Sequence, residues 1–391
     1  MSRFFIGLMS GTSLDGIDGV VVEFADGVDD AYSRSEAPLR VVAHAHRGFA
    51  ADLRQQLRAL NRSADDEIHR AALAGNALAR ECAALVETLL ERASPRRAEI
   101  VAIGCHGQTV RHRPGEFDGT GYSVQLNAPA LLAELTGIDV IADFRSRDVA
   151  AGGQGAPLVP AFHRALFGRA DRSVAVLNLG GIANLSLLSR SGATTGFDCG
   201  PANTLLDLWC QRTTGDSFDR GGAVAATGKV DARLLDALRV EPYFTLAPPK
   251  STGLDWFNSE WLDARLASAD VTARLSSQDV QATLAELTAR VCADACRDYA
   301  ADTAELVVCG GGAFNADLMA RLARAMSPTP VLASGERGLP PDQVEAAAFA
   351  WLARAFVERV PGNVAAVTGA AGPRLLGALH PATWAGERSA P

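Results

Sequence analysis

The chain has 391 residues, of which 48% are hydrophobic and 21% are charged, so it can bury a sizeable core and its length indicates two domains. A net charge of −8, with no basic run that carries interleaved aromatic residues, argues against a nucleic-acid binder. No apolar run is long enough to span a membrane and no signal peptide is visible, so we expect a cytoplasmic protein. The seven cysteines contain no C-x-x-C pair, which is typical of reduced thiols.

The first glycine-rich stretch, residues 7–18, lies between two apolar runs, 4–9 and 17–24, that we expect to form strands. Its turn combines small residues, hydroxyls and one carboxylate: Ser10, Gly11, Thr12, Ser13, Asp15 and Gly16. Small side chains let backbone N–H groups approach an anion, hydroxyls donate to phosphate oxygens, and a carboxylate holds a metal ion or its waters. An ordinary hairpin turn is the better explanation of this stretch by itself, but two later glycine loops of similar composition favour a cradle for phosphate and Mg²⁺.

Two helices are expected over residues 50–60 and 65–91, because apolar residues recur there at helical spacing and would cover a sheet. Before them, His44 and His46 alternate along a strand that begins near residue 39, so both would lie on one face. Without a third ligand nearby, we interpret them as surface or interface residues and not as a metal site.

A further strand is expected at residues 100–103, and polar residues follow at its tip: His106, Gln108 and Thr109. These side chains could bind a polar ligand or support the neighbouring loop. A lone histidine in such a place is more often a structural hydrogen-bonding residue than a catalyst.

The strand expected at residues 138–142 is followed by a glycine-rich loop, 150–157, and between them lies a charged cluster: Asp143, Arg145, Arg147 and Asp148. A hydrophobic core could not absorb this cluster, so it is either a solvated loop or a ligand pocket. Its place in a short connection after an apolar strand favours the pocket. We expect the first domain to end near residue 128.

The second half opens with a unit of the same kind as the first. An apolar strand at residues 174–179 runs into Gly180 and Gly181, and Asn184 precedes the expected hairpin partner at 185–188. The repeat of a strand, a glycine turn and a strand predicts a second phosphate-binding hairpin.

Asp198 is expected at the end of a short strand, just before Gly200 and a helix that starts near Thr204. Its carboxylate would then face a cleft, where it is well placed to act as a general base or a metal ligand. Helix capping is the common alternative, but Asn203 and Thr204 are better placed to cap that helix.

A third glycine loop follows the buried strand expected at 305–309 and consists of Gly310, Gly311 and Gly312. Glycines between a strand and a helix let the backbone approach a flat or anionic group, and Asn315 is available as a hydrogen-bonding cap. Glu345 lies in the first turn of the last long helix, where it either complements the helix dipole or points into the cleft.

These motifs resemble those of the actin, sugar-kinase and heat-shock-chaperone ATPase superfamily, which has a phosphate hairpin at the start of each half and a later adenosine loop. Within it, the sequence is most similar to the bacterial anhydro-N-acetylmuramic acid kinases. The matching stretches extend over nearly the whole chain: residues 9–18, 104–109, 143–157, 196–201, 249–253 and 309–315.

The resemblance implies an α/β fold of two ribonuclease-H-like domains, with mixed sheets flanked by helices and ATP in a central cleft. Domain I would comprise residues 1–128 and the C-terminal tail 365–391, and domain II residues 129–364. The family is a phosphotransferase family that uses ATP and water to open the 1,6-anhydro ring of 1,6-anhydro-N-acetylmuramic acid and to phosphorylate O6. The products are N-acetylmuramic acid 6-phosphate and ADP, in peptidoglycan recycling and amino-sugar catabolism.

The resemblance also implies roles for residues. Asp198 would be the base that deprotonates water for attack on the anomeric carbon. The β- and γ-phosphates of ATP and a Mg²⁺ ion, with Asp15 as a metal ligand, would be held by Ser10, Gly11, Thr12, Ser13, Asp15, Gly16 and Ile17. Further nucleotide contacts would come from Gly180, Gly181, Asn184, Gly310, Gly311, Gly312 and Asn315. The sugar would be bound by Arg147, Glu345 and Gln108, and the enzyme would be a homodimer.

Two other function classes would use the same ATP loops. A kinase of another sugar needs no water in its first step, so substrates with and without an anhydro bridge distinguish it. A non-enzymatic actin-like or chaperone-like ATPase would hydrolyse ATP slowly without any dependence on sugar, and the lack of an extra peptide-binding domain counts against the chaperone-like form.

Overall fold

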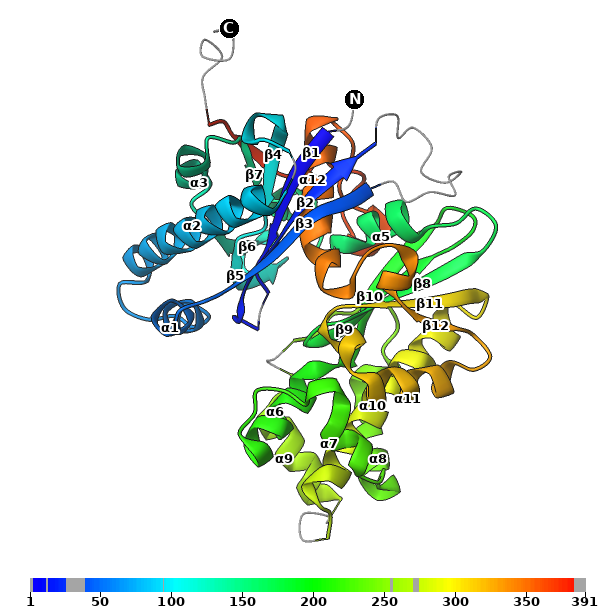
Figure 1. Cartoon of the computed structure of the whole chain (residues 1–391). Coiled ribbons are helices and arrows are strands. Elements are labelled where there is room, and N and C mark those ends of the chain that lie inside the picture. Colours follow the sequence, from blue (N-terminus) through cyan, green and yellow to red (C-terminus); the bar gives the residue numbers. More distant parts are fainter. Residues whose placement is uncertain are drawn as a thin grey trace, which may run out of the picture. The chain divides into compact units, whose positions relative to one another are not determined.

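The computed structural model describes residues 3–11, 13–25, 39–93, 95–253, 256–269 and 274–382. The chain forms two compact units (Figure 1). Unit 1 comprises Met1–Leu166 and Gln343–Pro391, and unit 2 comprises Phe167–Asp342. Each unit has its own central sheet and its own hydrophobic core.

Unit 1 is built on a six-stranded sheet with the order β13-β7-β4-β1-β2-β3. The strands of this sheet are β1 (Arg3–Met9), β2 (Gly16–Phe24), β3 (Leu39–Gly48), β4 (Ile100–Cys105), β7 (Val140–Ala142) and β13 (Ala378–His380). A separate hairpin consists of β5 (Gln108–Pro114) and β6 (Gly121–Leu126). The helices are α1 (Ala51–Ala59), α2 (Glu67–Arg92), η1 (Arg97–Glu99), α3 (Pro129–Thr136), α4 (Ser146–Val149), α12 (Val344–Val357) and α13 (Ala365–Thr368), and α5 (Val159–Phe167) ends at the boundary.

Unit 2 is built on a five-stranded sheet with the order β10-β9-β8-β11-β12. Its strands are β8 (Ser173–Leu179), β9 (Ile182–Leu188), β10 (Thr194–Pro201), β11 (Thr303–Cys309) and β12 (Val331–Ala333). Its helices are α6 (Asn203–Thr214), η2 (Arg220–Gly222), α7 (Ala223–Thr227), α8 (Ala232–Arg239), η3 (Pro242–Thr245), α9 (Ser259–Ser268), α10 (Ser277–Tyr299), η4 (Gly311–Phe314), α11 (Ala316–Met326) and η5 (Ser334–Arg337), and η6 (Pro341–Gln343) ends at the boundary.

The two sheets follow one plan. In each, the first strand pairs antiparallel with the second and the second antiparallel with the third, as in β1-β2-β3 and β8-β9-β10. The first strand also pairs parallel with the fourth, and the fourth parallel with the fifth, as in β1-β4-β7 and β8-β11-β12. This is the strand order of a ribonuclease-H-like fold. The prediction of an α/β chain with two related halves and mixed sheets flanked by helices is therefore confirmed.

Helices cover both faces of the sheet of unit 1 (Figure 1). On one face, a Cβ atom on Gly19 would meet the side chain of Leu89 from α2. On the other, a Cβ atom on Gly7 would overlap the carbonyl oxygen of Ala346 from α12. The faces differ because Gly19 pairs with Leu8, the neighbour of Gly7, and successive strand residues point to opposite sides. The two glycines therefore let helices of opposite faces pack closely on one hairpin.

The bounds of the two compact units differ from those of the expected domains. The expected domains were 1–128 with a C-terminal tail, and 129–364. The segment after residue 128 stays with unit 1, because β7 pairs parallel with β4 in its sheet. The chain returns to unit 1 already at Gln343, because α12 packs on Gly7 of the unit 1 sheet. Contacts between distant segments, which sequence spacing does not reveal, decide both boundaries: strand pairing the first, and helix packing on the sheet the second.

Candidate active site

The turn between β1 and β2 presents hydroxyl groups that were predicted to bind phosphate and a carboxylate that was predicted to bind Mg²⁺. Ser13 and Asp15 are exposed, and the Ser13 hydroxyl donates to the Asp15 carboxylate at 2.6 Å. Between them, Leu14 has a left-handed backbone (φ 56°) and buries its side chain in the core of unit 1. The buried leucine anchors the turn, so the polar residues on either side stay outside. Thr12 lies outside the described residues.

Gln108 supports this turn from β5. It is buried, its side-chain carbonyl accepts a hydrogen bond from the Ser10 hydroxyl, and its amide donates to the carbonyl groups of Gly11 at 3.1 Å and Thr109 at 3.3 Å. Of the two roles foreseen at this strand tip, the structure shows support of the neighbouring loop. Contact of Gln108 with the sugar stays a prediction.

His106 links the turn to the charged cluster. Its Nδ1 atom lies 3.2 Å from the carbonyl oxygen of Ser10, and its Nε2 atom lies 2.9 Å from a guanidinium nitrogen of Arg145. A carbonyl oxygen only accepts, so Nδ1 carries the proton and Nε2 accepts from Arg145. Burial and the charge of Arg145 lower the pKa of His106 to about 3, which keeps the ring neutral.

Of the two arginines in the charged cluster, Arg145 is the less exposed one. It donates to the carbonyl group of Gly155 at 2.7 Å, and Glu345 on α12 is close enough for its charge to act on the guanidinium. Burial lowers the pKa of Arg145 to about 10, against the opposing charges of Glu345 and Asp148. Arg147, which was predicted to bind the sugar, is exposed on α4. Spacing alone did not distinguish the inward Arg145 from the exposed Arg147, and contact of Arg147 with the sugar stays a prediction.

Asp148 fixes the loop that carries both arginines. Its carboxylate is fully buried and accepts hydrogen bonds from the N–H of Gly155 at 2.8 Å, the amide of Asn363 at 2.6 Å and the hydroxyl of Thr368 at 2.8 Å. Buried charges persist only with such hydrogen bonds. The loop is therefore attached to the C-terminal segment of the same unit.

In unit 2, three neighbouring strands carry polar residues at one register. Asn178 on β8 pairs with Asn184 on β9, and Asn184 pairs with Asp198 on β10. Side chains of directly paired residues share a face of the sheet, so these three form a row. The amide of Asn184 donates to Oδ1 of Asp198 at 2.8 Å. Asp198 lies inside β10, at a register shift before Gly200, and not at the strand end as expected, because β10 continues its pairing with β9 to Pro201.

The backbone of Asp198 is held on both sides. Its N–H donates to the carbonyl group of Lys250 at 3.1 Å, and its own carbonyl accepts from the Tyr243 hydroxyl at 2.8 Å. The Lys250 ammonium in turn donates to the carbonyl groups of Tyr243 at 3.2 Å and Phe244 at 3.1 Å. Asp198, Lys250 and Tyr243 thus form a closed ring of hydrogen bonds that fixes the backbone of Asp198 in place.

The Asp198 carboxylate has an unusual environment for an acid. Burial raises its pKa, against hydrogen bonds from Asn184 and the Thr252 N–H and the charge of Lys250. The Thr252 N–H donates to Oδ2 at 3.0 Å, so each carboxylate oxygen has one donor. A raised pKa makes the ionised form a stronger base, which suits proton abstraction.

Two buried polar atoms beside this row have no hydrogen-bond partner among the residues that the structure describes. They are Oδ1 of Asn178 and Oγ1 of Thr252. Leaving a buried polar group unpaired costs about 1–3 kcal/mol, so each such atom calls for an explanation. Both positions were missed as candidates, although a polar residue near the end of an otherwise apolar strand is a usable signal for Asn178.

The glycine loops of unit 2 come together near Asn178. A Cβ atom on Gly310, whose φ is 79°, would overlap the Asn178 side chain, and one on Gly312 would meet Leu179. Asn315 caps α11 as predicted, since its side chain accepts from the Leu318 N–H at 3.0 Å. Close backbone packing explains these glycines, and their contact with a nucleotide stays a prediction.

The expected capping of α6 by Asn203 or Thr204 is wrong. The N–H groups of these two residues donate to the carbonyl groups of Gly180 at 3.0 Å and Gly181 at 3.1 Å. Their side chains also donate to carbonyl groups of the β8–β9 turn, Asn203 to that of Leu179 and Thr204 to that of Gly181. The glycine turn itself caps the helix, so Gly180 and Gly181 lie at the N-terminus of α6.

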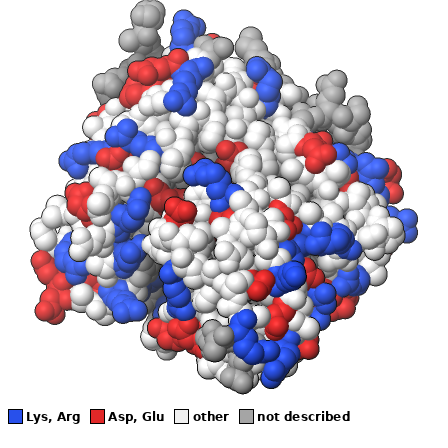
Figure 2. Space-filling model, turned by 60° about the horizontal axis from the view of Figure 1, so that its bottom comes forward, with Lys and Arg blue, Asp and Glu red and all other residues white. Residues whose placement is uncertain are grey.

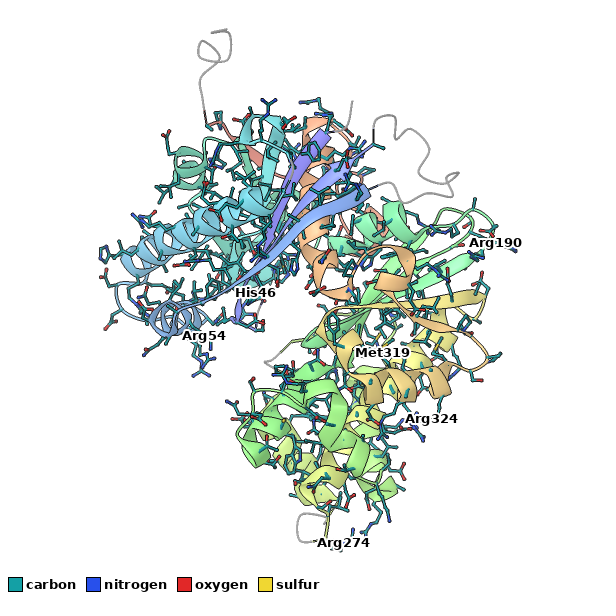
Figure 3. The ribbon with its side chains drawn as sticks, in the orientation of Figure 1. His46, Arg54, Arg190, Arg274, Met319 and Arg324 are labelled. Atoms are coloured by element: carbon teal, nitrogen blue, oxygen red, sulfur yellow. The ribbon has the colours of Figure 1, made fainter. Side chains whose placement is uncertain are left out.

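The histidines of β3 contact Asp18 on the neighbouring strand β2. Nδ1 of His46, labelled in Figure 3, lies 2.9 Å from Oδ1 of Asp18, and Nε2 of His44 lies 3.7 Å from the same atom. Within the described ranges, no group of three or more His, Cys, Asp and Glu residues is arranged to hold a metal ion.

The surface mixes charges of both signs on the face drawn in Figure 2. Over the part of the chain that is described, no helix has the length and apolar character needed to cross a bilayer.

The chain is similar to known proteins over nearly its whole length. A family model described as "Anhydro-N-acetylmuramic acid kinase" matches residues 3–382. A relative of that name from Variovorax paradoxus is 58% identical over 385 residues, which cover 97% of this chain and 99% of the relative. Another of that name from Bordetella petrii is 58% identical over 381 residues, which cover 97% of each. A solved structure of an activator of 2-hydroxyisocaproyl-CoA dehydratase from Clostridium difficile is 13% identical, covers 91% of this chain and 96% of that chain, and has a TM-score of 0.46.

Proposed function

The chain belongs to the anhydro-N-acetylmuramic acid kinase family, and from this premise we propose which residues carry out each step of the reaction. The protein is an ATP-dependent kinase that opens the 1,6-anhydro ring of 1,6-anhydro-N-acetylmuramic acid with water and phosphorylates O6. It forms N-acetylmuramic acid 6-phosphate and ADP in peptidoglycan recycling.

We assign the general base to Asp198, and the observation that carries this assignment is its fixed, doubly hydrogen-bonded carboxylate of raised pKa. One proton of water passes to Asp198 as the water oxygen bonds to the anomeric carbon. The bond from that carbon to O6 breaks and leaves its electron pair on O6. O6 then bonds to the γ-phosphorus of ATP, and ADP leaves. No covalent enzyme intermediate is needed.

For the nucleotide, the turn of unit 1 with Ser10, Gly11, Ser13 and Gly16 would bind the β- and γ-phosphates, together with Thr12 and Ile17. In unit 2, phosphate contacts would come from Gly180, Gly181 and Asn184, because a glycine turn has no side chains that keep its backbone N–H groups away from an anion. The adenosine would lie on Gly310, Gly311 and Gly312 beside Asn315. Phe314 is 57% exposed on the same loop and offers a ring for stacking on the adenine.

The carboxylate of Asp15 fits a Mg²⁺ ion. It is exposed and oriented by the Ser13 hydroxyl, and Mg²⁺ is usually bound through one or two carboxylates together with waters and substrate phosphates. The ion would neutralise charge on the transferred phosphoryl group.

For the sugar, we propose Arg147 and Glu345. An arginine suits the lactyl carboxylate through paired N–H donors, and a glutamate suits sugar hydroxyls or the acetamido N–H. The charge of Glu345 acts on Arg145, so the carboxylate belongs to the same polar network as His106. Gln108, which lies under the first turn, would also bind the sugar.

The first test is product analysis with Mg·ATP and 1,6-anhydro-N-acetylmuramic acid in ¹⁸O-water. The wild type should give a 6-phosphate that carries ¹⁸O at the anomeric carbon. Asp198→Asn keeps the shape of the side chain but removes the base, and should lower kcat by about 10²–10⁴-fold. Asp236→Asn, an exposed carboxylate on α8, is the matched control and should leave kcat unchanged.

Two results would contradict the assignment. Consumption of ATP without ring opening would mean that the substrate is another sugar. Wild-type kcat in Asp198→Asn would mean that the base is another residue.

We also propose a homodimer, which light scattering would report as twice the 40.9 kDa chain, and a cytoplasmic location, where ATP is available.

A further inference from the structure

We propose that the hydroxyl of Thr252 holds the attacking water beside Asp198, which makes Thr252 a second catalytic residue of the ring-opening step. Thr252 belongs to the stretch 249–253, which lies between η3 and α9 and has an irregular backbone. The inference rests on the proposed role of Asp198 as the base.

The first argument is the place of the hydroxyl. The Thr252 N–H donates to Oδ2 of Asp198 at 3.0 Å, and the hydroxyl of a threonine is only a few bonds away from its own N–H. One water molecule can therefore contact both the Asp198 carboxylate and Oγ1 of Thr252. The neighbours do not compete for this role, since Ser251 is exposed and the Lys250 ammonium donates to the carbonyl groups of Tyr243 and Phe244.

The second argument is the unused hydrogen-bonding capacity at this place. Oγ1 of Thr252 is buried and has no partner within the described ranges, although its N–H is bonded. Each oxygen of Asp198 accepts one hydrogen bond and keeps room for another. An enclosed water needs two to four polar partners, and the carboxylate and the hydroxyl supply the first two.

The geometry of a nucleophilic water explains why two acceptors are useful. A water that gives one hydrogen to Asp198 and the other to Oγ1 of Thr252 has both O–H bonds fixed. Its lone pair then points away from them, toward the anomeric carbon. Asp198 takes the proton as the new C–O bond forms, and Thr252 gains and loses none, so it acts by orientation alone.

The experiment compares Thr252→Val, which keeps the shape and removes the hydroxyl, with Thr252→Ser, which restores the hydroxyl. Thr303→Val, at a buried threonine near the start of β11 and at the opposite end of that strand from the glycine loop, is the matched control. For each variant we would measure kcat, the KM for ATP and for the sugar, the solvent deuterium isotope effect on kcat, and the melting temperature.

The proposal expects Thr252→Val to lower kcat roughly tenfold or more with the KM for ATP unchanged. It also expects a larger solvent isotope effect, because water attack becomes slower than the other steps, and near wild-type values for Thr252→Ser and Thr303→Val. Wild-type kcat in Thr252→Val would overturn the proposal, and so would equal impairment of Thr252→Ser and Thr252→Val. If Thr252→Val does not fold, Thr252→Ala replaces it in the same comparison with Thr252→Ser.

Failure of the underlying function would be distinguishable. If the wild type places no ¹⁸O at the anomeric carbon, the hydrolytic step itself is absent and Thr252 loses its role together with Asp198. If the wild type incorporates ¹⁸O and Thr252→Val does so at the same rate, only the role of Thr252 is overturned.

Discussion

A carboxylate is a useful base when its surroundings raise its pKa and still hold it in one position. At Asp198, burial raises the pKa, while the ring through Lys250 and Tyr243 holds the backbone. The other titratable groups beside it do not ionise near neutral pH: burial raises the pKa of Tyr243, and the contact with Cys292 and burial raise that of Cys199. Lys250 is therefore the neighbouring group whose charge can shift the pKa of Asp198.

Lys250→Met tests this tuning. The Lys250 charge opposes the upward shift of the pKa of Asp198, so its removal should raise that pKa further. The base works only when it is ionised, and activity is lost as the pH falls through its pKa. The acidic limb of the kcat profile should therefore move to higher pH, which a pH series from acidic to neutral buffer measures.

Lys229→Met is the matched control, because Lys229 is the other lysine of the chain and is exposed in the same unit. The same loss of charge there should leave the acidic limb in place. An unshifted limb in Lys250→Met would show that Lys250 acts on the backbone only.

At the scale of elements, the alanine-rich helix α12 is matched to glycines of the sheet. Cβ atoms on Gly7 and Gly104 would overlap the carbonyl oxygens of Ala346 and Phe349. Backbone contact of this kind requires glycine on the side of the sheet, because any Cβ atom there would overlap the helix backbone. The pairing holds Glu345, in the first turn of α12, against the end of the unit 1 sheet that carries Arg145 and the first turn.

Gly7→Ala should therefore destabilise the protein by about 1–3 kcal/mol or more, because the added methyl group meets rigid backbone and not a movable side chain. Urea unfolding measures the free energy. Gly335→Ala, where the nearest atoms lie 3.9 Å away or more, should be close to neutral. Equal stability of the two variants would mean that α12 moves away at little cost.

The elements could be predicted where pattern is strong and local. The apolar strands that became β1, β8 and β11, and the helix expected at 65–91 that became α2, follow from local sequence pattern alone. Contacts between distant segments could not be predicted in this way. Thr252 reaches Asp198 across irregular chain with no period, and the inward position of Arg145 and the exposed position of Arg147 depend on how a short helix turns. Motif resemblance predicted a catalytic role for Asp198, while its contacts with Lys250 and Tyr243 could be seen only in the structure.

At the scale of the whole molecule, the thiols report on folding. All seven cysteines are free and buried: Cys82, Cys105, Cys199, Cys210, Cys292, Cys296 and Cys309. They lie in both units, so a thiol reagent probes the two cores together.

The native protein should therefore react slowly with Ellman's reagent, and the protein unfolded without reductant should give all seven thiols at once. Absorbance at the end of each reaction counts them. Fewer thiols after unfolding would reveal a disulfide, and one fast thiol in the native protein would reveal a local opening of its unit.

The shared strand order means that one folding plan occurs twice in the chain. Both copies keep a hydrogen-bonded polar pair across their second and third strands, Asp18 with His46 at 2.9 Å and Asn184 with Asp198 at 2.8 Å. The acid lies on the second strand in one copy and on the third in the other. The two units thus share a topology and differ in which strand carries the acid, so the repeat of the fold does not repeat the arrangement of its polar side chains.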